Sequence, residues 1–295
     1  MKKGILYGLA FACLSPVLFY VVLVLDNNLG RDSVARQDVL DSLERSIVWL
    51  NENRAQLLEN RNAMLWWMVK RSLDLTDDAR LAALFADYEQ RQLASRRASY
   101  WRALFDPGYI PALSPDSIAH LPDYNQYFLY GLSCSQALAE SRVISAQFST
   151  DFCSRQHPFG PACVTHQMMG ILLRQQRNCG SPDELHEQIA TLQAVVLRQL
   201  TWDPRVVDVY VQRVLMLVQT GASERVKPRW LYRLLRAQHR SGAWGDFQPL
   251  VTLGKDLHLG FNRKGIAVGA HRASFHTTAQ GLLLTATLAA QSLSR

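Results

Sequence analysis

Three polar side chains of types that carry out acid/base chemistry stand early in predicted helices. They are His166 in "CVTHQ", Asp208 in "VVDVY" and His276 in "SFHTT". Imidazole exchanges protons near neutral pH, and a carboxylate can orient an imidazole. The three residues therefore predict a general acid/base set, or alternatively the three ligands of an open metal site.

Further candidates could contact a substrate through aromatic faces or amide groups. These substrate-binding candidates are Tyr124, Tyr127, Gln167, Tyr210 and Trp244. The structural alternative is that a histidine in the first turn of a helix bonds a neighbouring loop and that an aspartate there is a cap. No Gly-x-Ser-x-Gly, P-loop, His-Glu-x-x-His or Cys-x-x-Cys motif occurs, so the common nucleophile, nucleotide and zinc signatures are absent from the sequence.

The N-terminus carries a long apolar stretch. Residues 4–25, "GILYGLAFACLSPVLFYVVLVL", hold no charge, follow two lysines and precede Asp26. About 20 apolar residues suffice to cross a bilayer, and the flanking charges place the N-terminus in the cytoplasm. The sequence predicts an uncleaved signal anchor over 1–30 and an extracytoplasmic domain over 31–295, periplasmic in a Gram-negative cell. The protein would then be a single-pass membrane protein with the lipid bilayer as its first partner.

Charge and cysteine content add weaker constraints. The net charge is +7, but no Lys/Arg-rich run with interleaved aromatics occurs, so nucleic acid is not an expected partner.

Four cysteines follow the anchor, at positions 134, 153, 163 and 179. If Cys163 and Cys179 bracket a helix, they stand roughly 24 Å apart and cannot pair. Pairing of Cys153 with Cys163 or with Cys179 stays open, as does a set of four thiols.

The rest of the chain reads as helices joined by short loops. Apolar spacing and capping residues predict helical segments over 39–58, 62–75, 77–93, 124–148, 163–180, 181–200, 205–223, 227–238 and 274–293. No convincing alternation of β-branched residues occurs, and the predicted fold class is all-α. Tyr124, His166 and Asp208 follow one another at intervals of 42 residues, a period typical of stacked helix pairs.

One stretch carries a family resemblance. In "WLYRLLRAQHRSGAWGDF" a helix ends in Gln238, and a turn with Gly242 and Trp244 follows. This resembles the QW-type repeat of the terpenoid cyclase and protein prenyltransferase superfamily, and "FHTTAQGLLLTATLAA" is similar to the inner helix that follows such a turn. The resemblance implies an α/α toroid. Physically, the tryptophan would cover a helix end and the glutamine amide would satisfy backbone groups there.

A toroid implies that inner helices start at one end of a shared cavity. His166, Asp208 and His276 would then converge, and the Gly-rich basic segment 258–272 would be a lid or an exposed loop. Departures from the family matter. The Asp-x-Asp-Asp cluster of terpene cyclases is absent, and the Asp-x-Cys zinc partner of prenyltransferases is missing from "GDFQP". Prenyl transfer is therefore disfavoured, and zinc is in doubt.

The function expected from these features is that of a hydrolase or lyase acting on an envelope glycan or related polymer. The alternative is a non-catalytic module that binds or assembles with an envelope protein. The sequence does not indicate the substrate, the metal content or the oligomeric state.

Overall fold

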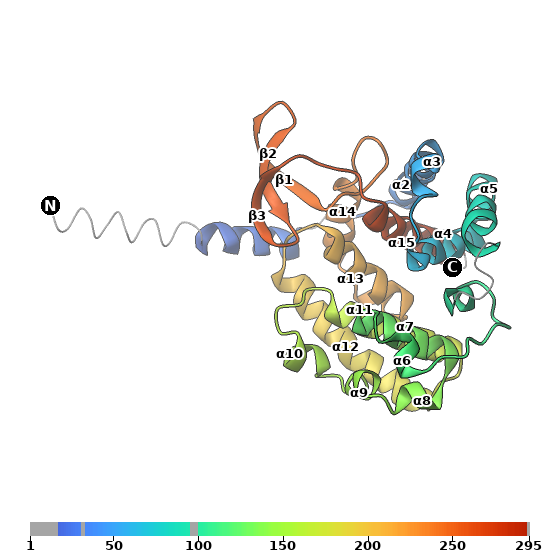
Figure 1. Cartoon of the computed structure of the whole chain (residues 1–295). Coiled ribbons are helices and arrows are strands. Elements are labelled where there is room, and N and C mark those ends of the chain that lie inside the picture. The colour runs from blue at the N-terminus through green and yellow to red at the C-terminus, as the bar shows by residue number, and fades with distance from the viewer. Residues whose placement is uncertain (1–16, 31–32, 95–99, 294–295) are drawn as a thin grey trace, which may run out of the picture.

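The computed structural model describes residues 17–30, 33–94 and 100–293. Residues 17–29 form a helix that extends away from the body of the molecule and meets the body at its C-terminal end (Figure 1). The further helices are α2 (Arg36–Glu52), α3 (Arg54–Leu57), α4 (Ala63–Thr76), α5 (Ala79–Tyr88), α6 (Pro115–Ile118), α7 (Asp123–Ser133), α8 (Gln136–Ala139), α9 (Arg142–Ala146), α10 (Phe152–Gln156), α11 (Cys163–Gln176), α12 (Pro182–Trp202), α13 (Asp208–Gln219), α14 (Pro228–Arg236) and α15 (Phe275–Leu293). Shorter π or 3-10 turns are η1 (Glu89–Leu93), η3 (Tyr100–Leu104) and η4 (Ser223–Arg225), and the strands are β1 (Phe247–Gly254), β2 (Leu257–Asn262) and β3 (Gly265–Gly269).

Five helices pack as successive neighbours around one core. Helix α7 lies against α11, α11 against α13, α13 against α15, and α15 against α4, while η3 contacts both α4 and α7. Helices α2, α5, α12 and α14 pack on the outside of this series (Figure 1). Buried apolar side chains from all of these helices form one continuous cluster. The helices contact one another in the order expected for a ring. The positions at which these helices start decide where the candidate site lies.

The turn that carries the family resemblance joins α14 to α2 and α15. Gln238 donates from Nε2 to the carbonyl oxygens of Ser42 (2.9 Å) and Gly242 (2.8 Å), while its Oε1 accepts from Arg45 and from the Ser42 hydroxyl. Trp244 is buried and donates from Nε1 to the carbonyl of Leu234 in α14 (3.0 Å). The tryptophan therefore binds a carbonyl in the last turn of α14, as expected, whereas the glutamine amide binds carbonyls inside α2 and in the turn, and not at a helix end.

The prediction of an all-α fold is wrong, because residues 247–269 form a three-stranded antiparallel sheet in the order β1-β2-β3. This stretch was expected to be a loop. The sheet projects from the helical body on the same side as helix 17–29 (Figure 1). Four glycines and two register shifts in β1 interrupt the alternation of side chains that marks a strand in sequence.

The membrane-spanning anchor is also contradicted. No helix in the described part of the chain is long and apolar enough to cross a membrane. Most of the expected span, residues 4–16, lies outside the described residues. The predictions of a signal anchor and of a single-pass membrane protein are corrected accordingly.

The polar end of helix 17–29 is bound to the domain. Asp26 pairs with Arg229 and Arg233 of α14, and Asn27 donates to the carbonyl of Leu200 (2.7 Å).

Two disulfides, Cys134–Cys179 and Cys153–Cys163, cross-link other parts of the domain. They select one of the pairings that the sequence left open, and disulfides are typical of proteins that fold in oxidising compartments.

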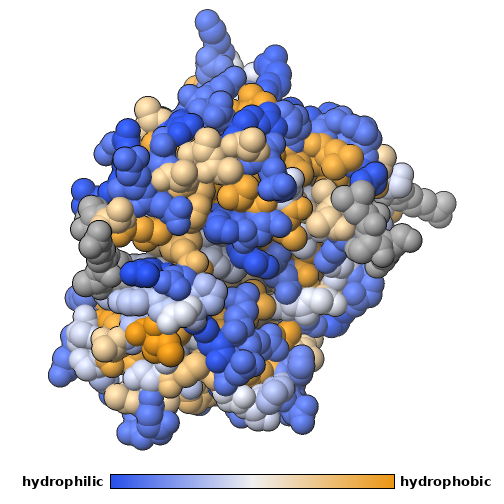
Figure 2. Space-filling model, turned by 90° about the vertical axis from the view of Figure 1, so that its right-hand side faces the viewer, coloured by the Kyte–Doolittle hydropathy of each residue, from blue (hydrophilic) through white to orange (hydrophobic). Residues whose placement is uncertain are grey.

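The exposed surface on the side opposite the sheet is mixed in character. Figure 2 shows small groups of hydrophobic residues interspersed with hydrophilic ones over this face. No single broad apolar area dominates the view, as expected for a surface in contact with water.

The close packing of Trp244 against α15 can be tested by changing Gly281. A Cβ atom at this position would lie 2.5 Å from the indole ring. Ala is normally favoured over Gly within a helix, but here we expect Gly281→Ala to destabilise the protein by about 1–3 kcal/mol through overpacking. Chemical denaturation checks this. The matched variant Gly254→Ala, where the new Cβ meets nothing within 4 Å, should be close to wild type, and an equal loss in both variants would contradict the packing argument.

Candidate functional site

The three acid/base candidates lie where the sequence placed them, near the starts of three neighbouring helices. His166 is in the first turn of α11, Asp208 is the first residue of α13, and His276 is the second residue of α15. The positive charge of His276 contributes to lowering the pKa of His166, and the negative charge of Asp208 acts to raise the pKa of His276. The side chains are therefore close enough to influence one another electrostatically.

His166 is held between aromatic rings. Its imidazole stacks on the ring of Tyr124 from α7, with centroids 4.4 Å apart, and meets the edge of Phe128 at 6.1 Å. Burial, followed by the charge of His276, lowers the pKa of His166 to about 4. At neutral pH the imidazole is therefore uncharged and able to accept a proton.

His276 and Asp208 stand beside it in different environments. The protein atoms around His276 lower its pKa by desolvation, although the residue keeps part of its surface exposed. Asp208 acts against this effect, and Arg263 adds to it. The Oδ1 atom of Asp208 is buried without a hydrogen-bond partner among the described residues, and Asp208 is not the cap of α13. An unsatisfied buried oxygen is costly and marks a place where a ligand or water can bind.

The metal alternative gains no support from this arrangement. In residues 17–30, 33–94 and 100–293, no group of three or more His, Cys, Asp or Glu side chains is placed to hold a metal ion. A three-ligand metal site requires all three donors within about 2.0–2.3 Å of one point.

A cleft of about 750 Å³ opens beside His166 and Tyr124. One wall is the loop between α10 and α11, which includes Phe159 and is closed by the Cys153–Cys163 disulfide. The opposite rim carries three cations, namely Arg205, Arg263 and Lys264. Asp123, the first residue of α7, adds one carboxylate to the lining. The cleft thus combines a neutral base, an aromatic face and a positively charged rim.

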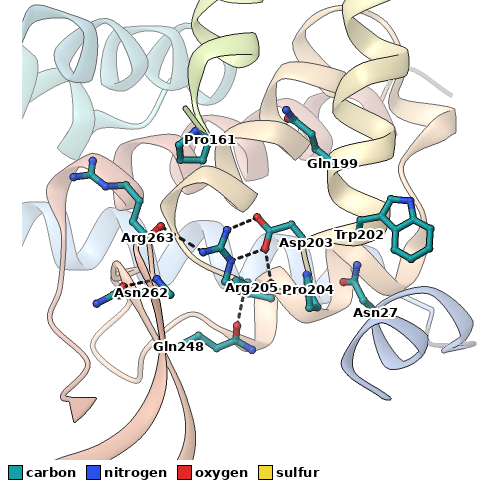
Figure 3. A network of polar contacts seen from close by, with 12 residues as sticks. Asn27, Pro161, Gln199, Trp202, Asp203, Pro204, Arg205, Gln248, Asn262 and Arg263 are labelled. Carbon is teal, nitrogen blue, oxygen red and sulfur yellow. Dashed lines mark hydrogen bonds and ion pairs between the residues drawn. The ribbon is translucent and has the colours of Figure 1, made fainter. Parts of the chain in front are cut away.

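Both walls of the cleft depend on one carboxylate, that of Asp203. Arg205 binds it through Nε (2.6 Å) and the buried Arg213 binds it through Nη1 (2.9 Å). Arg213 also donates to the carbonyl of Pro161 in the disulfide loop, and Arg205 donates to the carbonyl of Arg263 in the β2–β3 turn (both 3.4 Å). Figure 3 shows Arg205 between Asp203 and the turn that carries Arg263.

The lowered pKa of Asp203 is consistent with its pairing with two arginines. Burial by itself would raise the pKa of Asp203, but the hydrogen bonds from Arg205 and the charge of Arg213 outweigh it, so the pKa lies below its ordinary value. The backbone N–H of Val206 is fixed in turn by the side chain of Gln248 in β1 (2.7 Å). The segment between α12 and α13 is thereby tied to the sheet.

Of the five substrate-contact candidates, Tyr124 alone lines this cleft, and it is 39% exposed. The others are buried and have structural partners. Tyr127 packs under Gly170 and accepts a hydrogen bond from Arg174, and burial raises its pKa. Gln167 donates to the carbonyl oxygens of Gln147 and Ser149 (2.9 and 2.7 Å).

Tyr210 and Trp244 likewise serve the fold. Tyr210 donates its hydroxyl to Asn27 (3.0 Å), which fastens helix 17–29, and Trp244 closes the end of α14. Neither side chain lines the cleft. The expectation that they contact substrate has no geometric support.

Comparison with known proteins finds no match: no protein family, no curated protein and no solved structure is similar to this chain. The resemblance to the terpenoid cyclase and prenyltransferase superfamily accordingly stays a prediction.

Sequence reasoning missed the residues that build the rim. Asp203 and Arg205 stand in "WDPRVV", a stretch that reads as an ordinary helix end followed by a loop. Arg263 and Lys264 belong to the basic segment for which a lid was one of two alternatives, and the structure places their turn at the rim of the cleft. In the sequence these two residues are recognisable only as a basic pair. The β2–β3 hairpin of the structure is what shows that the pair lies at the rim of the cleft.

The dependence on Asp203 gives a direct test. Asp203→Asn leaves the buried Arg213 without its counter-ion, so we expect a loss of about 3–5 kcal/mol in the free energy of unfolding. Urea denaturation measures this loss. The control is Asp106→Asn, which breaks an exposed pair with Arg102 and should leave the stability close to that of wild type. Similar losses in the two variants would show that the buried network is unimportant.

The lowered pKa of His166 predicts a pH effect on stability. The unfolded chain takes up a proton near pH 6.5, whereas folded His166 does so only near pH 4. Stability should therefore fall as the pH drops from about 6.5 towards 4, by up to about 1.4 kcal/mol per pH unit for this group. His166→Gln removes the group, so the variant should lose about 2 kcal/mol less than wild type between pH 6.5 and 4.5. Parallel losses, measured by urea titration at each pH, would contradict the assignment.

Proposed function

We propose that this protein is an enzyme, a hydrolase or lyase, that cleaves a glycan or a related polymer in the cleft between the disulfide loop and the β2–β3 turn. The observation that carries the proposal is that neutral His166, with His276 in electrostatic range, lines a cleft that also holds an aromatic face and cations. A cleft of about 750 Å³ is of the size that accommodates a few sugar rings or a drug-sized ligand.

The roles follow from the environment of each group. Neutral His166 serves as the general base, and His276 serves as the proton donor, with the charge of Asp208 opposing the burial and the Arg263 charge that together lower its pKa. Tyr124 offers a partly exposed ring for a sugar face. The ring-like order of the helices supports the further proposal that the fold is toroid-like, since it brings the helix starts together.

The alternative is a binding or assembly module, and one feature favours it. Val251, Leu259 and Val268 are paired across the three strands and share one face of the sheet. Val251 and Val268 are 53% and 58% exposed. An exposed apolar face of this kind suits contact with another protein, and it lies outside the residues assigned to catalysis.

The proposal is tested by cleavage assays on a panel of neutral and acidic glycans, followed by the appearance of new reducing ends. His166→Gln and His276→Gln should each lower kcat about 10²–10⁴-fold, the usual contribution of general acid/base catalysis. The exposed His186 on α12 provides the control, His186→Gln, which should keep wild-type kcat. Circular dichroism verifies folding of every variant.

The same assays report the protonation states. Catalysis needs His166 neutral and His276 protonated, so kcat/KM should rise as the pH passes the pKa of His166, about 4, and should fall again below neutral pH, because the pKa of His276 is also lowered. Cleavage that is unaffected by both histidine variants, or a panel in which wild type cleaves nothing, would overturn the enzyme assignment and leave the binding module.

A further inference from the structure

Two cations on the rim of the cleft have no counter-ion. Arg263 and Lys264 are exposed, and within the described residues neither side chain forms an ion pair. The third cation, Arg205, is different because both its Nε and its Nη2 bind Asp203. The positive potential of Arg263 and Lys264 is therefore available to a ligand.

The turn presents these two side chains in a fixed position. Asn262 accepts hydrogen bonds at Oδ1 from the backbone N–H groups of Lys264 (2.8 Å) and Gly265 (3.0 Å). Gly265 has a φ of +144°, a conformation that side-chain-bearing residues rarely adopt. Arg205 holds the carbonyl of Arg263 from the other side. The backbone beneath the two cations is thus anchored to both the hairpin and the helical body.

Arg263 also stands near the proton-transfer groups. Its charge helps to lower the pKa of His276, which places the guanidinium within electrostatic range of that imidazole. Arg263 also lines the same cleft as His166, so a substrate charge bound by Arg263 would lie in the cleft that holds the general base. The residue that would bind a negative charge and the residue that would accept a proton therefore belong to the same cleft.

The acidic groups of the cleft do not fit ordinary glycoside hydrolysis. Such hydrolysis uses two carboxylates, one on each side of the scissile bond. Asp123 is the one carboxylate among the described lining residues, and Asp208 lies beside His276 instead of on the lining. A neutral imidazole together with cations is instead the equipment for removing a carbon-bound proton next to a carboxylate.

We propose that the substrate is an anionic polysaccharide containing uronate residues and that the cleft cleaves it by β-elimination. This inference rests on the proposed function and narrows it to one substrate class and one reaction. Arg263 and Lys264 bind the uronate carboxylate and stabilise the charge that develops on it.

The step balances without a co-reactant. His166 takes the proton from C5, the carbon next to the carboxylate, and the electron pair of that bond forms the C4–C5 double bond. The bond between C4 and the glycosidic oxygen breaks, and the departing oxygen receives a proton from His276. His166 then returns its proton to His276 or to solvent, and no water is consumed in the cleavage.

The test uses the full chain with three polymers: a uronate polysaccharide, the same polymer with its carboxyl groups reduced to alcohols, and a neutral glycan. Two signals are followed, new reducing ends and the ultraviolet absorbance of a double bond conjugated to a carboxylate. Elimination predicts that both signals rise together on the uronate polymer and that neither rises on the other two.

The outcomes separate this inference from the proposed function. Reducing ends without the absorbance indicate hydrolysis, which overturns the elimination and leaves the enzyme assignment standing. Equal cleavage of the carboxyl-reduced polymer overturns the requirement for negative charge. Absence of reducing ends on every polymer overturns both proposals.

Charge recognition is tested with matched variants on the same hairpin. Arg263→Gln combined with Lys264→Gln should raise KM for the uronate polymer at least tenfold. Lys255 is an exposed cation in the β1–β2 turn and does not line the cleft, so Lys255→Gln should leave KM unchanged. Equal KM values for the double variant and wild type, or an equal rise in the control, would overturn the assignment of the two cations.

Discussion

The carboxylate of Asp203, bound by two arginines in the interior, is the constraint on which the shape of the cleft depends. Taking three charged groups out of water is costly, and such a cluster persists only when each charge is well paired. Here Arg213 and Arg205 pair with the same carboxylate, and each donates one further hydrogen bond to a wall of the cleft, to the carbonyl groups of Pro161 and Arg263 respectively. These carbonyls belong to the two opposite walls. The ion cluster therefore sets the separation of the walls, and the geometry of the site follows from it.

The helical part of the fold was accessible from the sequence because helix periodicity and caps are local signals. Asp78, for example, accepts hydrogen bonds from the N–H groups of Arg80 and Leu81 and starts α5 as expected. The sheet was not accessible, since Gly254, Gly260, Gly265 and Gly269 break its alternation of side chains. Gly260 is required where β2 passes β1, as a Cβ there would meet the carbonyl of Gln248 at 2.2 Å. Gly260, one of the glycines that obscure the strands in the sequence, is thus required for the strands to pack.

Part of the candidate site could likewise be predicted from the sequence, and part could not. Helix starts can be located from sequence, so the places of His166, Asp208 and His276 were predictable. Which face of a helix meets a neighbour depends on tertiary packing. Tyr124 and Tyr127 are three residues apart, yet the first stacks on His166 at the cleft and the second is buried against Gly170. The ion cluster around Asp203 joins segments from α12 to the hairpin, and no local pattern encodes a contact over such separations.

The lowered pKa of His276 and the cationic rim are linked, because the charge of Arg263 adds to the desolvation that lowers this pKa. Helices α7 and α11 start at the lining of the cleft, and the unpaired N–H groups of a helix start carry partial positive charge. Arg263 and Lys264 increase this positive potential. Burial, followed by the charge of His276, keeps His166 neutral, whereas the positive potential of the rim favours a bound anion. A negatively charged substrate would partly neutralise the potential, and the pKa of His276 would then rise on binding. Substrate charge would thereby move this imidazole towards the protonated form that the proposed reaction requires, so binding and proton donation are coupled through the same electric field.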